Sequence, residues 1–200
     1  MVRRAFFAGT LLLVLSTSSV LAATSIVKIK GTGYVPLSTT VAMGGSVQWK
    51  NRTGKSRTVA ADTSYVTSWF LPNTTVAPYS LSVVRTFPEA GSFGFHDTTK
   101  ATLRGTIVVP MTASVTVLSV NESVTLTLGT APTNSTGLPV AHYVQASKDG
   151  GAWTLIAQTN ANTFGWKVTS AGTYQVRTYL HHLLSGANTG VSPTVTITAF

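Results

Sequence analysis

Hydrophobic and polar positions alternate over short stretches along most of the chain. Phe93 and Phe95 form one such run, Ile107 and Val109 form another, and a polar stretch lies between them. Because strand side chains point alternately to opposite faces, the two runs predict antiparallel strands joined by a polar loop. The same pattern predicts further strands around residues 26–30, 37–41, 47–49 and 80–87. The chain is therefore predicted to be all-β.

The strand pattern starts again after Val109-Pro110-Met111. Proline cannot donate to a strand ladder, so Pro110 is expected to end the last strand of the first series. Alternating positions resume at residues 115–117 and 124–128, and Lys148-Asp149-Gly150-Gly151 is a hairpin-turn signal. Residues 23–110 and 111–200 are predicted to form two tandem β-sandwiches, each near the ~100 residues usual for small sandwiches.

Residues 1–22 predict a cleaved signal peptide. Arg3-Arg4 precedes an apolar stretch over residues 5–15, and Val20-Leu21-Ala22 fits the small-residue cleavage pattern. The apolar stretch is too short for a good membrane span. We therefore expect a secreted or extracellular protein with no membrane span in the mature chain. Both the general secretory route and the twin-arginine route, which Arg3-Arg4 also resembles, stay open.

The 200 residues include no cysteine and only 10% charged residues. Exported domains without disulfides have to be stabilised by core burial alone. The missing thiols exclude a thiolate metal ligand and a cysteine nucleophile. No pair of carboxylates is spaced for acid–base work, and no Ser or Thr has a convincing His and acid partner set. We therefore expect no catalytic site and no enzyme activity.

The first half resembles the cupredoxin (plastocyanin-like, blue copper) family. The resemblance rests on Gly33-Tyr34-Val35-Pro36, Val47-Gln48-Trp49, the Phe93-x-Phe95 pair and Gly105-Thr106-Ile107. It implies a Greek-key sandwich with a copper site. The ligands in that family are a thiolate, imidazoles and an axial thioether, which suit copper. The family's His, Cys, His and Met positions correspond to Arg57, Asp97, Lys100 and Leu103.

None of these four residues matches the family's ligand at its position. A guanidinium and an ammonium offer no lone pair near neutral pH, so the copper site is predicted to be lost and no cofactor is expected. The replacements are expected to converge as the ligands would. Asp97 should then pair closely with Arg57 and more loosely with Lys100, while Leu103 covers the site with apolar contact.

The histidines do not predict another metal site. His96 is expected to be a solvent-exposed loop residue with one nearby carboxylate. His181 and His182 are adjacent on a predicted strand, so their side chains should point to opposite faces.

The second half resembles a fibronectin type III-like (immunoglobulin-like) module. The resemblance rests on three segments, at residues 147–153, 171–177 and 190–193. It implies that Tyr174 is the corner tyrosine of the sandwich. The family's tryptophan on the second strand has Leu128 as its nearest equivalent.

Positive charge is concentrated in the first half of the chain. Six cations belong to the two loops around the former copper position: Lys50, Arg52, Lys55, Arg57, Lys100 and Arg104. A cationic end of this kind attracts anionic polymers. The alternative is a face that only keeps the protein soluble. Export and the lack of a repeated basic–aromatic pattern argue against nucleic acid.

Three function classes therefore compete. The first is a secreted, non-catalytic protein with a metal-free cupredoxin-like domain and a fibronectin-like module. It would be a binding or cell-envelope-associated protein, with an anionic envelope polymer, a polysaccharide or another extracellular protein as partner. The second is a copper-binding electron-transfer protein, which the resemblance alone suggests. The third is an extracellular enzyme.

Overall fold

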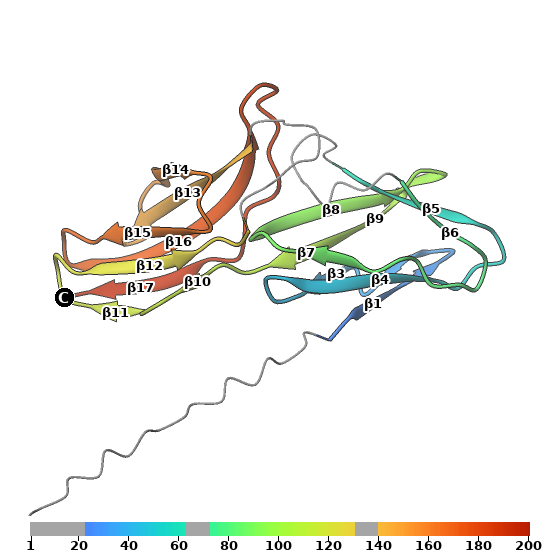
Figure 1. The fold of residues 1–200 in the computed structure, drawn as a ribbon, viewed down its shortest axis with the longest axis horizontal. Coiled ribbons are helices and arrows are strands. Elements are labelled where there is room, and N and C mark those ends of the chain that lie inside the picture. The colour runs from blue at the N-terminus through green and yellow to red at the C-terminus, as the bar shows by residue number, and fades with distance from the viewer. Residues whose placement is uncertain (1–22, 63–72, 131–139) are drawn as a thin grey trace, which may run out of the picture.

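The computed structural model describes residues 23–62, 73–130 and 140–200, and every regular element in these ranges is a β-strand. The strands form four sheets, two from the first half of the chain and two from the second. The two halves lie end to end in Figure 1. The predicted all-β class is confirmed. The predicted leader lies outside the described residues, and none of the described residues forms a helix long and apolar enough to cross a membrane.

In its described residues, the first sandwich contains nine strands in two sheets. One sheet has the order β2-β1-β4-β7, with β1 (Ser25–Lys30), β2 (Gly33–Val35), β4 (Gly45–Asn51) and β7 (Arg85–Phe87). The other has the order β3-β9-β8-β5-β6, with β3 (Ser38–Thr40), β5 (Arg57–Ala61), β6 (Thr74–Val76), β8 (Gly91–Asp97) and β9 (Lys100–Val109). Buried apolar side chains from both sheets, Trp49, Phe93, Phe95 and Ile107 among them, form the core.

The strand predicted over residues 80–87 is mostly wrong, because only Arg85–Phe87 forms a regular strand. Leu81 makes an isolated bridge to Lys50. At the next residue the Ser82 hydroxyl accepts the Trp49 N–H at 2.9 Å, so a side chain takes the place of a backbone partner. The same hydroxyl donates to the neighbouring Val83 carbonyl at 2.8 Å, and a local side-chain bond of this kind competes with a regular ladder.

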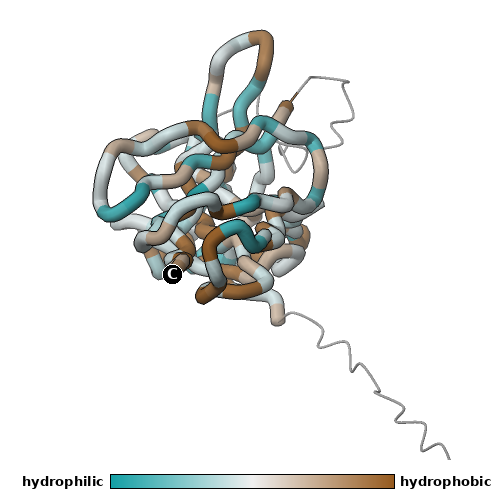
Figure 2. Tube along the Cα trace, turned by 90° about the vertical axis from the view of Figure 1, so that its left-hand side faces the viewer, coloured by the Kyte–Doolittle hydropathy of each residue, from teal (hydrophilic) through white to brown (hydrophobic). Residues whose placement is uncertain are grey.

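The part of the second sandwich that the structure describes contains eight strands. A three-stranded sheet has the order β10-β12-β15, with β10 (Thr112–Ala113), β12 (Ser123–Thr127) and β15 (Thr163–Lys167). A five-stranded sheet has the order β11-β17-β16-β13-β14, with β11 (Val117–Leu118), β13 (Val140–Lys148), β14 (Thr154–Thr159), β16 (Gly172–His182) and β17 (Val195–Ala199). Viewed from this end, short hydrophobic and hydrophilic stretches alternate along the chain (Figure 2).

Tyr174 has the geometry expected of a corner tyrosine. It lies near the start of β16, and its hydroxyl donates to the Ser170 carbonyl at 2.8 Å, four residues upstream. The ring packs edge-on against Trp166 of β15 at 5.1 Å. Tyr174 therefore fastens the connection between the two sheets. Leu128, just after β12, is fully buried in the same core.

The connection between the sandwiches is not an exposed linker. Met111 is only 2% exposed and belongs to the second core, while Val140 and Leu180 of the second half pack in the first core. Ser92 and Gly190 exchange two backbone hydrogen bonds of 2.9 Å across the junction. The sandwiches therefore share packing and hydrogen bonds. The boundary at residues 110 and 111 stays a prediction.

Candidate functional site

The segment between Phe95 and Ile107 is a tight hairpin, not the predicted polar loop. β8 ends at Asp97, β9 begins at Lys100, and these two residues face each other across the ladder. One Asp97 oxygen, Oδ1, accepts the Thr99 N–H at 2.8 Å and the Thr99 hydroxyl at 2.6 Å. An aspartate that bonds to the backbone two residues ahead stabilises a turn. The hydrogen bonds of Asp97 therefore close a tight turn where the sequence predicted a polar loop.

Asp97 is paired with Arg57, as predicted, and the structure shows that it is also buried. The alternation along β8 places Asp97 on the core face with Phe93 and Phe95. Its other oxygen, Oδ2, accepts from Nη1 of Arg57 at 3.2 Å, and the two side chains are 0% and 15% exposed. A buried charge requires this kind of partner, because leaving it alone costs several kcal/mol.

Tyr34 is a buried residue that interacts electrostatically with Asp97 and Arg57. Its ring packs against Phe95 at 4.7 Å, and its side chain is almost inaccessible. Burial raises the pKa of the Tyr34 phenol far above its usual value, and the negative charge of Asp97 raises it further. Tyr34 is therefore a neutral phenol at physiological pH.

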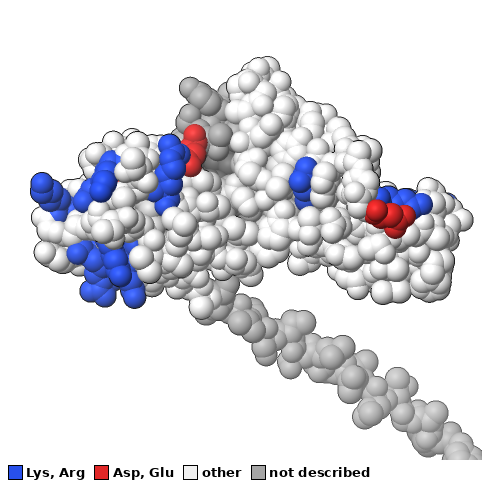
Figure 3. Space-filling model, turned by 180° about the vertical axis from the view of Figure 1, so that it is seen from behind, with Lys and Arg blue, Asp and Glu red and all other residues white. Residues whose placement is uncertain are grey.

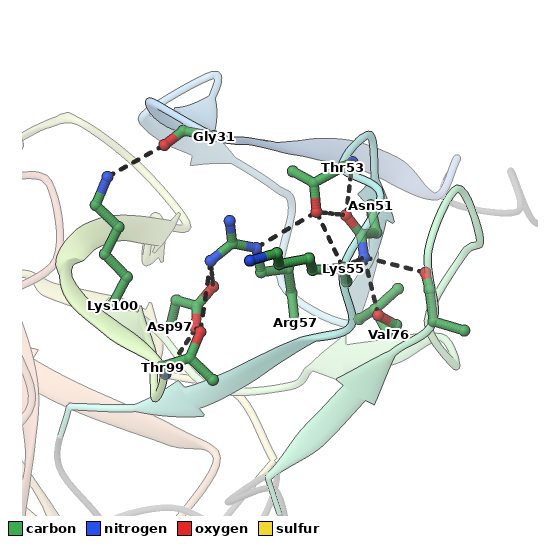
Figure 4. Close-up of polar contacts among 10 residues, drawn as sticks. Gly31, Asn51, Thr53, Lys55, Arg57, Val76, Asp97, Thr99 and Lys100 are labelled. Carbon is green, nitrogen blue, oxygen red and sulfur yellow. Dashed lines mark hydrogen bonds and ion pairs between the residues drawn. The ribbon is translucent and has the colours of Figure 1, made fainter.

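Further hydrogen bonds connect Arg57 to the preceding loop (Figure 4). Nε of Arg57 donates to the Thr53 hydroxyl at 3.4 Å, and that hydroxyl donates to Asn51 Oδ1 at 2.8 Å. Asn51 is fully buried, and its amide donates to the carbonyls of Lys55, Val76 and Ala77. The network joins β4, β5 and β6 with the β8–β9 hairpin and fixes this end of the sandwich.

Lys100 does not join the pair, so its expected convergence on Asp97 is wrong. Its ammonium donates to the Gly31 carbonyl at 3.2 Å, away from Arg57 (Figure 4). The reason is the hairpin, since Lys100 starts β9 as an exposed residue and has no loop to bring it inward. Leu103 is 4% exposed and belongs to the first core.

These residues do not fit a copper ion. The carboxylate of Asp97 is already paired with the guanidinium of Arg57, and the Lys100 ammonium donates to Gly31. Leu103 has no side-chain atom that could bind a metal. Within the described residues, no three His, Cys, Asp or Glu side chains gather as a metal site. The only ligand type left at the four positions is one carboxylate, which is already neutralised.

His96 is not a loop residue, which corrects the prediction. It lies on β8, and its side chain is 25% exposed on the face opposite Asp97. Nδ1 of His96 lies 2.6 Å from Asp62 Oδ1, which also accepts from Arg104 Nη1 at 2.9 Å. Gly94 makes room for this cluster, because a Cβ there would lie 2.5 Å from Asp62 Oδ2.

The structure divides the predicted basic patch into paired and unpaired cations. Arg57 and Arg104 form ion pairs with Asp97 and Asp62. No ion pair within the described residues involves Lys50, Arg52, Lys55 or Lys100, and basic side chains gather over the first sandwich in Figure 3.

The structure adds Lys28 and Lys30 to the unpaired cations. β1 pairs with β4 in parallel, and Lys28 lies directly beside Lys50 in the register. Lys28 and Lys30 are exposed on the side opposite the buried Val27 and Ile29. Sequence reasoning missed them because β1 and β4 are separated by two other strands in the sequence. The alternation around Val27 and Ile29 predicted the strand but not its neighbour.

No protein-family model matches the chain, and no curated protein matches it. Amicyanins are found among similar solved structures. A reduced Cu(I) form of an amicyanin variant at pH 4 is 25% identical and covers 46% of this chain and 86% of its own, with a TM-score of 0.38. Amicyanin from Paracoccus versutus (Thiobacillus versutus) is 21% identical and covers 46% of this chain and 85% of its own, with a TM-score of 0.37. This likeness is too weak to carry a functional argument.

Proposed function

We propose that the protein is an exported, non-catalytic binding protein whose first sandwich holds an anionic polymer of the cell envelope. The binding surface is the lysine face, defined as Lys28, Lys30, Lys50 and Arg52 on and beside the β1–β4 pair. The leader pattern of residues 1–22 supports export. The first sandwich is a cupredoxin-like domain without a copper site.

The observation that carries the proposal is the adjacency of Lys28 and Lys50. Neighbouring strands lie about 4.8 Å apart, and like charges placed directly opposite each other destabilise a sheet. No carboxylate of the described residues forms an ion pair with either lysine. A polyanion would relieve this repulsion, and its attraction would weaken with salt.

The second half is proposed to be a fibronectin type III-like module. The three- and five-stranded sheets and the Tyr174–Ser170 hydrogen bond support this assignment. In this proposal the module provides a second surface, and the packing and hydrogen bonds across the junction hold it against the first sandwich.

Copper electron transfer is the weaker candidate. The four ligand positions hold Arg57, Asp97, Lys100 and Leu103, and the arginine and aspartate are bound to each other. Fold likeness cannot supply a function whose site residues have changed.

Retention of the mature protein on immobilised dextran sulfate and polygalacturonate, measured against salt, tests the proposal. We expect Lys28→Gln/Lys50→Gln to weaken binding roughly thirtyfold, since each of the two cations near an anionic surface contributes about 1 kcal/mol. The matched control is Lys148→Gln/Lys167→Gln, which removes the same charge from the second sandwich. Equal effects of the two double variants would show non-specific attraction and reject the lysine face.

A further inference from the structure

The outer face of the five-stranded sheet carries a cluster of aromatic side chains. We define the aromatic face as Tyr143, Trp153, Tyr179 and His181, together with Gln145, Gln158 and Arg177. The ring centres of Tyr143 and Tyr179 lie 5.6 Å apart, and those of Tyr143 and His181 lie 4.4 Å apart. The strands that carry the face, β13 and β14 with their neighbour β16, are at the upper left of Figure 1.

The register places these side chains on the same side of the sheet. Tyr143 of β13 lies between Tyr179 of β16 and Gln158 of β14. The alternate residues Val144 and Val176 are fully buried in the second core. The aromatic side chains therefore point outward, and each is partly exposed. They are not needed to fill the core, so the core does not explain why aromatic residues stand there.

Arg177 is held within this face. Its guanidinium lies 3.9 Å from the centre of the Trp153 ring, and its Nε donates to Gln145 Oε1 at 2.9 Å. A stacked arginine with a fixed hydrogen bond is ordered before any ligand arrives. It also fixes Trp153, which lies just before β14, against the sheet.

The strands of this sheet contain no Asp or Glu, and their cations are Arg177 and Lys148. Lys148 is at the end of β13 and donates to the Ser170 hydroxyl. A ligand on the aromatic face would therefore meet rings, side-chain amides and one arginine that is already engaged. A nucleic acid would require several unpaired cations beside the rings, which this face lacks.

We propose that the aromatic face binds a neutral polysaccharide chain. The rings of Tyr143, Trp153 and Tyr179 would stack on the C–H faces of successive sugars. The amides of Gln145 and Gln158 and the tyrosine hydroxyls would bond to sugar hydroxyls. Tyrosine and tryptophan suit such a ligand because each combines a large apolar ring with a polar tip. From Gln175 to His181, β16 runs for roughly 20 Å, which is long enough for a short oligosaccharide.

This inference is independent of the lysine face. The two surfaces belong to different sandwiches and use different forces. Polyanion binding through lysines falls with salt, whereas stacking on aromatic rings persists. At about 1 M salt the Debye length is only about 3 Å, so the two contributions can be separated.

Co-sedimentation of the mature protein with insoluble cellulose, chitin, β-1,3-glucan and xylan at low salt and at about 1 M NaCl tests the proposal. We expect at least one of these neutral polysaccharides to bind at both salt concentrations. Tyr143→Leu and Tyr179→Leu should each weaken binding about tenfold, because a ring contact is lost while apolar bulk is kept. Tyr79→Leu is the matched control, since Tyr79 is 71% exposed in the first half of the chain.

Failure of all four polysaccharides to bind, or equal binding by Tyr143→Leu and the unmodified protein, would overturn the proposal. Thermal unfolding of each variant shows whether it has folded. If Tyr143→Leu does not fold, Trp153→Leu gives the same test from outside the strands. Loss of binding only in Lys28→Gln/Lys50→Gln would instead assign the polysaccharide to the lysine face.

Discussion

Asp97 and Asp62 are two carboxylates of the first sandwich that each bind an arginine, yet their surroundings differ. Asp97 is fully buried on the core face of β8 and accepts from Arg57 and Thr99. Asp62, just after β5, is 30% exposed on the other face and accepts from Arg104, which is 58% exposed. The first pair lies within the fold and the second lies on its surface.

This difference in solvent exposure determines how much each ion pair contributes to the stability of the fold. Water screens the Asp62–Arg104 attraction, so the pair adds little stability. Asp97 cannot be solvated, so the loss of either partner leaves a buried charge without compensation. The Asp97–Arg57 pair is therefore part of the buried structure of the fold, whereas the Asp62 cluster mainly reduces the positive charge of the first sandwich.

The largest effect is expected for Asp97→Ala. The substitution leaves Arg57 without its carboxylate and removes both bonds to Thr99, so we expect a loss of roughly 3–5 kcal/mol in the free energy of unfolding. Urea denaturation followed by tryptophan fluorescence measures it. Asp97→Asn, which retains an acceptor for Thr99, should lose less. A loss below about 1 kcal/mol for Asp97→Ala would contradict the buried-pair interpretation.

A buried ionisable group in the second sandwich should make stability depend on pH. His142 is fully buried on the inner face of β13 beside Val144, and burial lowers its pKa to about 4. Between the unfolded pKa near 6.5 and the folded value of about 4, the unfolded chain binds the extra proton. Stability is therefore complete above pH ~6.5 and falls by up to about 3 kcal/mol as the pH drops to ~4.

Denaturation curves between pH 7.5 and pH 4 in the unmodified protein and in His142→Leu check this prediction. The leucine variant should lose less stability on acidification, because leucine has no group that can bind a proton. Identical pH dependence in the two proteins would show that other groups control the acid response.

A smaller effect is expected for Tyr174→Phe. The change removes the hydroxyl that donates to Ser170 and keeps the ring against Trp166. A hydrogen bond of this kind contributes about 1 kcal/mol, so the melting temperature should fall by a few degrees. Tyr179→Phe, on the outer face of the same strand, is the control and should be close to neutral. A larger loss for the control would contradict the corner role.

The smallest effect is expected for Asp62→Ala. The exposed pair contributes about 0.5 kcal/mol, and high salt should remove even this difference. The variant should bind dextran sulfate slightly more tightly, because Arg104 and His96 lose their carboxylate. A loss of stability as large as that of Asp97→Ala would mean that the two carboxylates do not differ as their exposure indicates.

The sequence by itself determined the strands whose apolar positions alternate. The two-residue period predicted the strands that carry Phe93 with Phe95 and Ile107 with Val109, because local geometry fixes which side chains share a face. The resemblance to fibronectin-like modules also indicated Tyr174 as a corner residue. The resemblance to cupredoxins indicated Arg57 with Asp97 as a pair.

Only the tertiary structure decided which strands became neighbours. The Lys28–Lys50 adjacency, the Asp62–His96 contact and the aromatic face around Tyr143 all depend on register between segments far apart in the sequence. Alternation gives the direction of a side chain but not its partner across the ladder. The hairpin at Asp97 shows the same limit, because two side-chain bonds to Thr99 close a tight turn where a polar loop was expected, and Lys100 bonds to Gly31 instead of Asp97.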